Sequence, residues 1–439
     1  VDLLSAWVNQ GGRLIALRPD DKLSTLLGIS PAEGTISEGY LQVSRARWGV
    51  SDVPLQFHGQ ADLHAALAGT TAEGQLFEGD QTQTPYPIIT LRESIGPGAG
   101  KAAGFMFDLA RSVIWTRQGS PALAAQGPAL DSVARSSEFF NGFLDTDNFL
   151  IPQADEQQRL FVRLLHDVNH DQTPLPRLWY LPGGRKLGVV ITGDDHNANG
   201  TVAFFDTLAA PPYSPTGCSV ADWSCARATS WVYSNVSGLK NGAGATFVAN
   251  GFELGPHMAM DRDGGCADWV SLSDLLARFS ARQSEFKSDY GIEPAATNRS
   301  HCFVFPDWDT HTKVEAQLGV RLDANYTPYA LPGTKNKLGR LNGSASPMRF
   351  TDTAGETLDI YQLVSDMDYE YFDGGTSRSQ MAQAIGVVFD TALGADGFWG
   401  FVGTHFDYSG GIEADFRAAL LDEIMERQAA GVAVISAKQ

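Results

Sequence analysis

The stretch LGVVITGDDH, residues 187–196, decides the fold of the second half of this chain. Its first six residues form an apolar run rich in Val and Ile, which is typical of a buried strand. The run ends abruptly at Asp194, Asp195 and His196. Because functional side chains of α/β proteins gather where strands end and loops begin, these three residues are the first candidates for a site.

Strand-like and helix-like segments alternate from residue 187 to the C-terminus. Segments rich in Val, Ile and Phe predict strands over 187–193, 245–255, 297–305, 358–366 and 398–410. Apolar residues at helical spacing predict helices over 201–209, 269–291, 311–320, 377–393 and 412–431. This alternation is typical of a parallel sheet, either closed into a barrel or doubly wound. The predicted fold class is therefore α/β.

The composition is that of a globular protein with more than one domain. The chain has 439 residues, of which 43% are hydrophobic and 19% are charged. Its net charge of −19 disfavours sequence-independent binding to nucleic acid or anionic lipid, since both need a basic surface. No apolar run approaches the roughly 20 residues of a membrane helix, so no membrane span is expected. The oligomeric state is left open.

The four cysteines bear on where the protein works. Cys218 and Cys225 flank the short loop CSVADWSC, which is full of turn residues. A disulfide here would mark a secreted or cell-surface protein, and buried free thiols are the alternative. The cysteine spacing is not that of a zinc site built from paired CxxC motifs. The first residues already read as the middle of a helix, so a trimmed N-terminus is expected.

Residues 1–125 form a separate predicted α/β region. Helix-like VDLLSAWVNQGG and KLSTLLGI alternate with strand-like GRLIALRP and PIITLRES. Together with GPGAGKAAGFMFDL, these pieces resemble the class I glutamine-amidotransferase-like fold, which implies a Rossmann-like or flavodoxin-like accessory domain. No Cys precedes Cys218, so the nucleophile that glutaminase chemistry needs is missing. Residues 126–185 are interpreted as a connector and residues 186–439 as the catalytic domain.

Polar side chains follow each predicted strand of residues 186–439. Beyond the first three candidates, these are Glu253, His257, Arg299, His301, Asp366, Asp368, His405 and Asp407. Because the carboxyl ends of parallel strands share one face of a barrel, we expect them to converge. Carboxylates with several histidines suit a divalent metal, Zn²⁺ above all, with Co²⁺ or Ni²⁺ as alternatives. His311, at the start of a helix-like segment, is expected at the surface.

Five pieces of this region resemble the polysaccharide deacetylases, the NodB-homology family. TGDDH resembles the first motif, "T-F-D-D", and GFELGPHMAMD resembles the second, "G-H-E-[IL]-G-x-H-[ST]-x-x-H". TNRSHCF, SDMDYE and VGTHF resemble the third, fourth and fifth motifs, in the family's order. The resemblance covers residues 185–430 and implies a distorted (β/α) barrel. Gly193 and Phe252 stand where the family has an aromatic residue and a histidine, which leaves the substrate open.

The resemblance implies catalytic roles for five residues. Asp194 would be the general base, and Arg299 would orient it. His405 would be the general acid, and either Asp366 or Asp368 would tune it.

The resemblance also implies the residues that hold the metal. Asp195 and His257 would be two of the ligands. The third is left open between Asp261, which lies four residues after His257, and His301. Three further residues are candidates for substrate contact: His196, Glu253 and Trp308.

The implied reaction is metal-dependent de-N-acetylation of an N-acetylated aminosugar polysaccharide or oligosaccharide. Water activated at the metal would attack the acetamide carbonyl, with Asp194 as the base and His405 as the acid. One alternative is a metal-dependent hydrolase of another bond, such as an O-acetyl ester or a non-sugar amide. The other alternative is a non-catalytic glycan-binding protein that has lost the metal.

Overall fold

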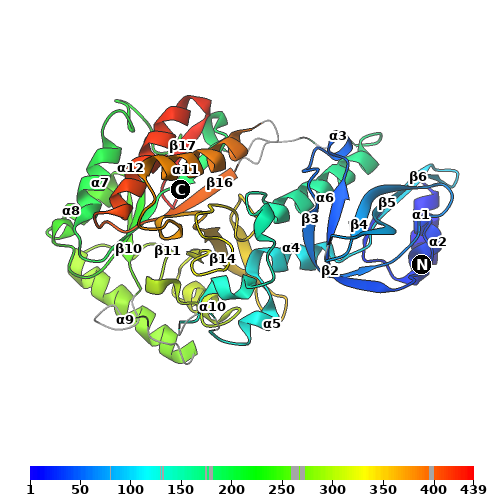
Figure 1. The fold of residues 1–439 in the computed structure, drawn as a ribbon, viewed down its shortest axis with the longest axis horizontal. Coiled ribbons are helices and arrows are strands. Elements are labelled where there is room, and N and C mark those ends of the chain that lie inside the picture. Colours follow the sequence, from blue (N-terminus) through cyan, green and yellow to red (C-terminus); the bar gives the residue numbers. More distant parts are fainter. Residues whose placement is uncertain are drawn as a thin grey trace. The chain divides into compact units, whose positions relative to one another are not determined.

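The computed structural model divides into two compact units (Figure 1). The first unit comprises residues 1–117 and 152–178, and the second comprises residues 118–151 and 179–439. The segment interpreted as one connector is therefore shared between the units. The structure describes residues 1–79, 81–128, 130, 133–173, 176, 181–258, 266, 272–394 and 400–439.

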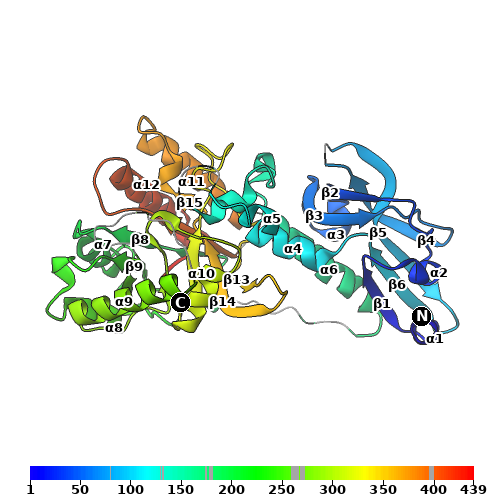
Figure 2. The ribbon, with the colours of Figure 1, turned by 90° about the horizontal axis from the view of Figure 1, so that it is seen from below.

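A six-stranded mixed sheet forms the first unit (Figure 2). Its strands are β1 (Arg13–Leu17), β2 (Thr35–Val43), β3 (Leu55–Asp62), β4 (Thr70–Phe77), β5 (Gln83–Ile95) and β6 (Gly100–Phe105). Their order is β1-β6-β5-β4-β2-β3, in which β1 and β6 pair in parallel and the other four pairings are antiparallel. The helices are α1 (Asp2–Asn9), η1 (Asp21–Leu23), α2 (Ser24–Leu27), α3 (Arg45–Trp48), α4 (Leu109–Gln118) and α6 (Gln153–Asn169).

This sheet differs from the parallel sheet of the predicted Rossmann-like or flavodoxin-like domain. Only residues 96–99 join β5 to β6. So short a connection joins antiparallel strands, whereas parallel neighbours need a crossover of about a dozen residues or more. The glycine-rich stretch GPGAGKAAG thus supplies a turn and most of a strand whose residues are all buried.

The second unit contains three short sheets. Its strands are β7 (Leu187–Val190), β8 (Thr192–Asp195), β9 (Thr229–Val232), β10 (Glu253–Pro256), β11 (Thr297–Asn298), β12 (Leu322–Tyr326), β13 (Met348–Thr351), β14 (Thr357–Val364), β15 (Met367–Asp368), β16 (Gly400–His405) and β17 (Val432–Ile435). The orders are β10-β9-β8, β11-β12-β14-β13 and β15-β16-β7-β17. All pairings are parallel except that of β13 with β14. The described pairings thus form several sheets and not one closed barrel.

Isolated bridges bring the edges of these sheets together. Asp194 at the end of β8 bridges to Asp407 beyond β16, and Met258 beyond β10 bridges to Ser300 beyond β11. The carboxyl ends of strands from all three sheets therefore lie close together.

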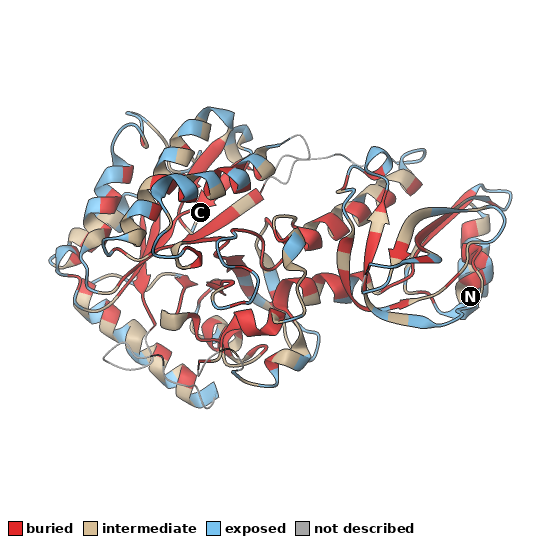
Figure 3. Cartoon of the chain, viewed as in Figure 1, coloured by how far each residue is buried: buried red, intermediate tan, exposed pale blue. Residues whose placement is uncertain are grey.

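Helices cover the sheets of the second unit. They are α5 (Pro121–Ala124), α7 (Gly200–Ala209), α8 (Ala243–Ala249), α9 (Leu272–Tyr290), α10 (Thr310–Gln317), α11 (Arg378–Leu393) and α12 (Ile412–Arg427). The 3₁₀ helices are η2 (Ser136–Phe140), η3 (Thr146–Asn148), η4 (Pro182–Gly184), η5 (Ser237–Leu239), η6 (His301–Phe303), η7 (Tyr369–Tyr371) and η8 (Gln428–Ala430). Helices α11 and α12 lie side by side, with buried inner and exposed outer faces (Figure 3).

The main hydrophobic core lies between β7 and the pair α11 and α12. Leu187 and Val189 of β7 are fully buried and belong to one cluster with Phe389 of α11 and Phe416 and Leu420 of α12. Burying apolar side chains of this size contributes about 1.5–3 kcal/mol each. Strand β7, which leads through Ile191 of the same cluster into β8 and its aspartate pair, is therefore anchored by packed apolar side chains.

Two disulfides cross-link the second unit. Cys218 pairs with Cys225, which confirms the bond predicted from the loop between them, and Cys266 pairs with Cys302. None of the described helices is both long and apolar enough to span a membrane.

Candidate active site

A cavity of about 150 Å³ opens where the strands of the second unit end. Its lining comes from the ends of β8, β10, β11 and β16, from η6 and η7, and from three other segments. The lining residues are Arg135, Asp194, His196, His257, Cys266, Ser300, His301, Cys302, Phe303, Tyr329, Glu370, His405 and Asp407.

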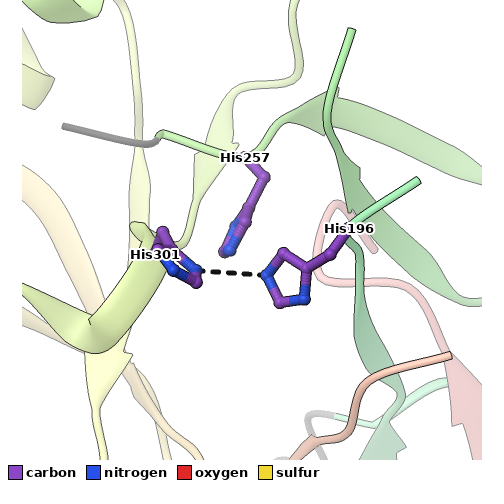
Figure 4. Close-up of side chains that lie close together, drawn as sticks. All are labelled: His196, His257 and His301. Atoms are coloured by element: carbon purple, nitrogen blue, oxygen red, sulfur yellow. Dashed lines mark hydrogen bonds between the residues drawn. The ribbon is translucent and has the colours of Figure 1, made fainter. Parts of the chain in front are cut away.

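Three of these residues form a group that we call the three-histidine cluster: His196, His257 and His301. One ring nitrogen from each lies within 4.8 Å of the others. Figure 4 shows the three rings turned toward one another, with His301 Nδ1 3.1 Å from His196 Nε2. His257 Nε2 is buried and has no hydrogen-bond partner among the described residues. Three imidazole nitrogens at this separation are a donor set that suits Zn²⁺, Co²⁺ or Ni²⁺.

The outer nitrogens of two of these rings are held by acceptors. His257 Nδ1 donates a hydrogen bond of 3.1 Å to the carbonyl oxygen of Arg299, and this leaves the Nε2 lone pair facing the cluster. His196 Nδ1 lies 3.3 Å from Asp407 Oδ2. Histidines that ligate metals almost always donate their second N–H to a carbonyl or carboxylate in this way.

The charge state of the cluster is set by burial and by neighbouring charges. Burial lowers the pKa of His257 well below its usual value, which outweighs the opposing effect of Asp194. Its ring is therefore neutral at neutral pH, which is the form that binds a metal. Burial by itself would lower the pKa of His196. The hydrogen bond and the negative charge of Asp407 raise this pKa by a larger amount, so the net shift is upward.

Asp194 lies beside the cluster as an ionised carboxylate. Its Oδ2 is 3.8 Å from His257 Nε2 and 3.0 Å from Arg299 Nε, which donates to both carboxylate oxygens. Arg299 is fully buried, and its guanidinium lies 4.5 Å from the centre of the Trp231 ring. Burial by itself would raise the pKa of Asp194. Arg299, His257 and His405 together lower it by a larger amount, so the pKa lies well below its usual range.

His405 lies on the other side of Asp194. Its Nε2 is 3.3 Å from Asp194 Oδ2, and its Nδ1 is 2.9 Å from Asp368 Oδ1. Burial lowers the pKa of His405, but Asp368 and Asp194 together raise it well above its usual value. Asp368 is itself fixed, because it accepts a hydrogen bond of 2.9 Å from Thr327 Oγ1. The imidazole is therefore a protonated group with one N–H directed at Asp194.

Asp195 is placed differently from its predicted role as a metal ligand. Its carboxylate accepts hydrogen bonds from Asn199 N (3.1 Å), Thr201 N (3.0 Å) and Thr201 Oγ1 (2.8 Å). These contacts satisfy free backbone N–H groups at the start of α7, which is what a helix-capping carboxylate does. Successive side chains of a strand point to opposite faces, so His196 and Asp194 share the cavity face and Asp195 does not.

Three other predicted residues lie away from the cavity. Asp366, the alternative partner for His405, is 3.1 Å from Arg340 Nη1. Glu253, expected at the substrate, is at the amino end of β10 and accepts from Thr229 Oγ1 at 2.7 Å. Trp308, also expected at the substrate, is 5% exposed and donates to the carbonyl of Thr351. Asp261 lies outside the described residues.

Several residues of the site were not assigned a role from the sequence. Phe303 and Tyr369 lie with ring centres 4.8 and 5.4 Å from that of His405. Tyr233, after β9, lies 5.0 Å from His196 by the same measure. The strand-end position of Asp407 was visible in the sequence, but Arg135 carried no sequence signal because it comes from the segment interpreted as a connector.

No family model matches the chain, and no curated protein matches it by sequence. Solved structures with a similar fold include a family 4 carbohydrate esterase from Streptomyces lividans in complex with acetate, 13% identical, covering 57% of this chain and 91% of that one with a TM-score of 0.32. A polysaccharide deacetylase from Bacillus cereus is 12% identical, with coverage of 57% and 92% and a TM-score of 0.32. A peptidoglycan deacetylase from Bacillus subtilis is 11% identical, with coverage of 58% and 90% and a TM-score of 0.31. The assignment of a function therefore depends on the side chains of the cavity.

Proposed function

We propose that this protein is a metal-dependent deacetylase that removes N-acetyl groups from an aminosugar polysaccharide or oligosaccharide. One observation carries the proposal: three imidazoles whose nitrogens lie within 4.8 Å of one another share one cavity with Asp194 and His405. Hydrolysis of an amide needs an electrophilic centre, a base for water and an acid for the leaving nitrogen, and each has a candidate here.

The three-histidine cluster would hold the metal, with Zn²⁺ first and Co²⁺ or Ni²⁺ as alternatives. Catalytic zinc sites use three protein ligands and keep one position for water or substrate. When bound, the cation polarises a carbonyl oxygen and lowers the pKa of a water molecule toward about 7. His196 takes the role first assigned to Asp195, because the oxygens of Asp195 are occupied at the start of α7.

Asp194 is the proposed general base. It is ionised, and the two-oxygen contact with Arg299 fixes the plane of its carboxylate. Its Oδ2 lies 3.8 Å from His257 Nε2, so a water molecule held at the cluster is within reach of a proton acceptor. The low pKa that Arg299 imposes keeps this group unprotonated at neutral pH.

His405 is the proposed general acid. Asp368 accepts from Nδ1 and stabilises the imidazolium, which leaves the Nε2 proton on the cavity side. An amine is a poor leaving group until its nitrogen is protonated, whereas an alcohol leaves an ester more readily. A histidine kept protonated in the cavity therefore supports an amide substrate over an O-acetyl ester.

The surroundings support a glycan substrate. Phe303 and Tyr329 line the cavity, so aromatic rings are available there for a sugar ring to stack against. The net charge of −19 favours a neutral or cationic polymer over an anionic one. Two disulfides support a secreted or cell-surface location.

Acetate release tests the proposal. The zinc-loaded protein should release acetate from N-acetylated chito-oligomers faster than from an O-acetylated sugar ester. His257→Ala should lower the metal content by one ion per chain and abolish turnover. Release from the ester alone would replace the proposal with an esterase, and unchanged metal content in His257→Ala would refute the three-histidine site.

A further inference from the structure

A second group of metal-ligating side chains lies outside the cavity. We call it the His–Glu–Asp cluster: His311 and Glu315, one turn apart on α10, and Asp323 on β12. His311 Nε2 is 3.3 Å from Glu315 Oε1 and 3.8 Å from Asp323 Oδ2, and all three side chains have 0% exposure. The expected surface position of His311 is therefore wrong; its ring stacks on that of Phe305, with centres 4.8 Å apart. His311 and Glu315 are four residues apart and so lie on one face of α10, and this face is buried in the protein interior.

The cluster holds two buried carboxyl groups, and no Lys or Arg of the described part of the chain forms an ion pair with either. Among the described residues, only His311 forms an ion-pair contact with Glu315 or Asp323. Burial lowers the pKa of His311 to about 4, so its ring is neutral at pH 7. Burial raises the pKa of Glu315 to about 8 and that of Asp323 well above its usual value. A buried carboxylate without a charged partner is costly, so the atoms around these two carboxyl groups decide what balances them.

Unpartnered buried oxygens favour a cation. Glu315 Oε2 and Asn298 Oδ1 are buried and have no hydrogen-bond partner among the described residues. The two side chains are in contact, since Asn298 Nδ2 donates to Glu315 Oε1 at 2.6 Å. Buried polar atoms are nearly always paired, so unpartnered oxygens beside a neutral imidazole indicate a missing electron-pair acceptor.

We propose that the His–Glu–Asp cluster is a second, structural site for a divalent cation, with Zn²⁺ as the favoured ion. One imidazole nitrogen and two carboxylate oxygens are accepted zinc ligands. A dication neutralises both carboxylates and needs no further charged partner. Because the cluster has no exposed surface, it offers no route for substrate, and its role is to stabilise the fold.

The site would brace the segment that serves the cavity. Residues 298–301 are held to the cluster at two points: Asn298 contacts Glu315, and Ser300 N donates to Asn325 Oδ1 at 2.7 Å. Asn325 Nδ2 in turn donates to Asp323 and lies 3.2 Å from His311 Nε2, so it holds the imidazole and the carboxylate of the cluster in place. The arginine and histidine carried by this segment are those that face Asp194 and the three-histidine cluster. This consequence for catalysis rests on the proposed function, whereas the existence of the second site does not.

Metal counting tests the site. The full chain, purified in zinc-containing buffer and dialysed, should hold two ions per chain by plasma emission spectrometry. Glu315→Gln and His257→Ala should each hold one, and the double variant none. Glu253→Gln is the matched control, because Glu253 is an equally buried carboxyl outside both clusters, and it should hold two. One ion in both the unaltered chain and Glu315→Gln would overturn the second site.

Zinc-edge anomalous diffraction on the unaltered protein avoids any loss of folding in the variants. A peak about 2 Å from His311 Nε2 is expected, in addition to one at the three-histidine cluster. A peak at the three histidines alone overturns the second site and leaves the proposed function standing. A peak at His311 alone supports the second site and overturns the proposed function, which needs a metal at the three histidines.

Discussion

The three-histidine cluster and the His–Glu–Asp cluster differ both in their side chains and in their access to solvent. The first lines a cavity, and the side chain of His196 is 27% exposed. The second is fully buried and carries two carboxyl groups. Catalytic metal sites keep one coordination position open, whereas structural sites are closed. The difference teaches that, within one unit, the route from solvent separates a group of ligands that can react from one that can only stabilise.

The largest expected effect is on the rate of acetate release, without any change in metal binding at the three-histidine cluster. Asp194→Asn should lower kcat for acetate release about 10³-fold, because an amide does not accept the proton of water. The metal content of both clusters should stay unchanged, which is the control. Turnover within tenfold of the unaltered enzyme would show that Asp194 is not the base.

The next effect concerns pH. The pKa of His405 in the folded protein is raised, so the stability from its contact with Asp368 is present below about pH 6.5 and is lost as pH rises through the folded pKa. Asp368→Asn removes the strongest contribution that raises this pKa. The alkaline limb of the kcat/KM profile should move to lower pH by about one unit, which is about a tenfold loss at pH values above the limb.

Asp366 provides the matched control for this shift. It is buried, as Asp368 is, and its carboxylate pairs with Arg340 and not with His405. Asp366→Asn should therefore leave the position of the alkaline limb unchanged, whatever it does to stability. Equal shifts in the two variants would mean that the limb does not report His405.

The smallest effect compares neighbours on one strand. Asp195→Asn should lower the free energy of unfolding by about 1 kcal/mol, through weaker hydrogen bonds at the start of α7, and keep the metal. His196→Ala should have nearly the same free energy of unfolding as the unaltered protein when both are metal-free, and it should lose the metal of the three-histidine cluster. Denaturant unfolding and metal analysis measure the two quantities. Loss of metal in Asp195→Asn would return Asp195 to the ligand set.

The sequence predicted the location of the cavity because rigid strand ends supply it. Asp194, His257, Arg299 and His405 were all chosen as polar residues that follow apolar runs, and the structure brings all four together. Of the neighbours at the end of β8, Asp194 and His196 line the cavity, whereas Asp195 contacts the start of α7. Strand alternation places residues i and i+2 on one side, and applying it to residues 194–196 would have favoured His196 over Asp195.

Other parts of the chain have sequence patterns too weak to predict their helices and strands. Strands β9, β12 and β17 are only four or five residues long and lie between irregular segments, so no period could be read from them. The predicted strand over 245–255 is helix α8 followed by β10, since an apolar run of this length fits either state. In the first unit, β2, β3 and β4 went unpredicted because they do not alternate strictly between buried and exposed residues: β2 and β3 each have three consecutive buried residues, and β4 has one buried residue.

The rim of the cavity has a different origin from its floor. Arg135, whose guanidinium lies 4.8 Å from the centre of the Tyr329 ring, belongs to neither a strand nor a strand end, and nor does Tyr329. Strand ends thus position most of the polar groups of the site, while Arg135 is tied to it from a connecting segment, because its Nε donates to the carbonyl oxygen of Cys302 at 2.9 Å. Replacing the segments that carry Arg135 and Tyr329 should therefore change which molecules bind in the cavity while the strand ends keep their positions.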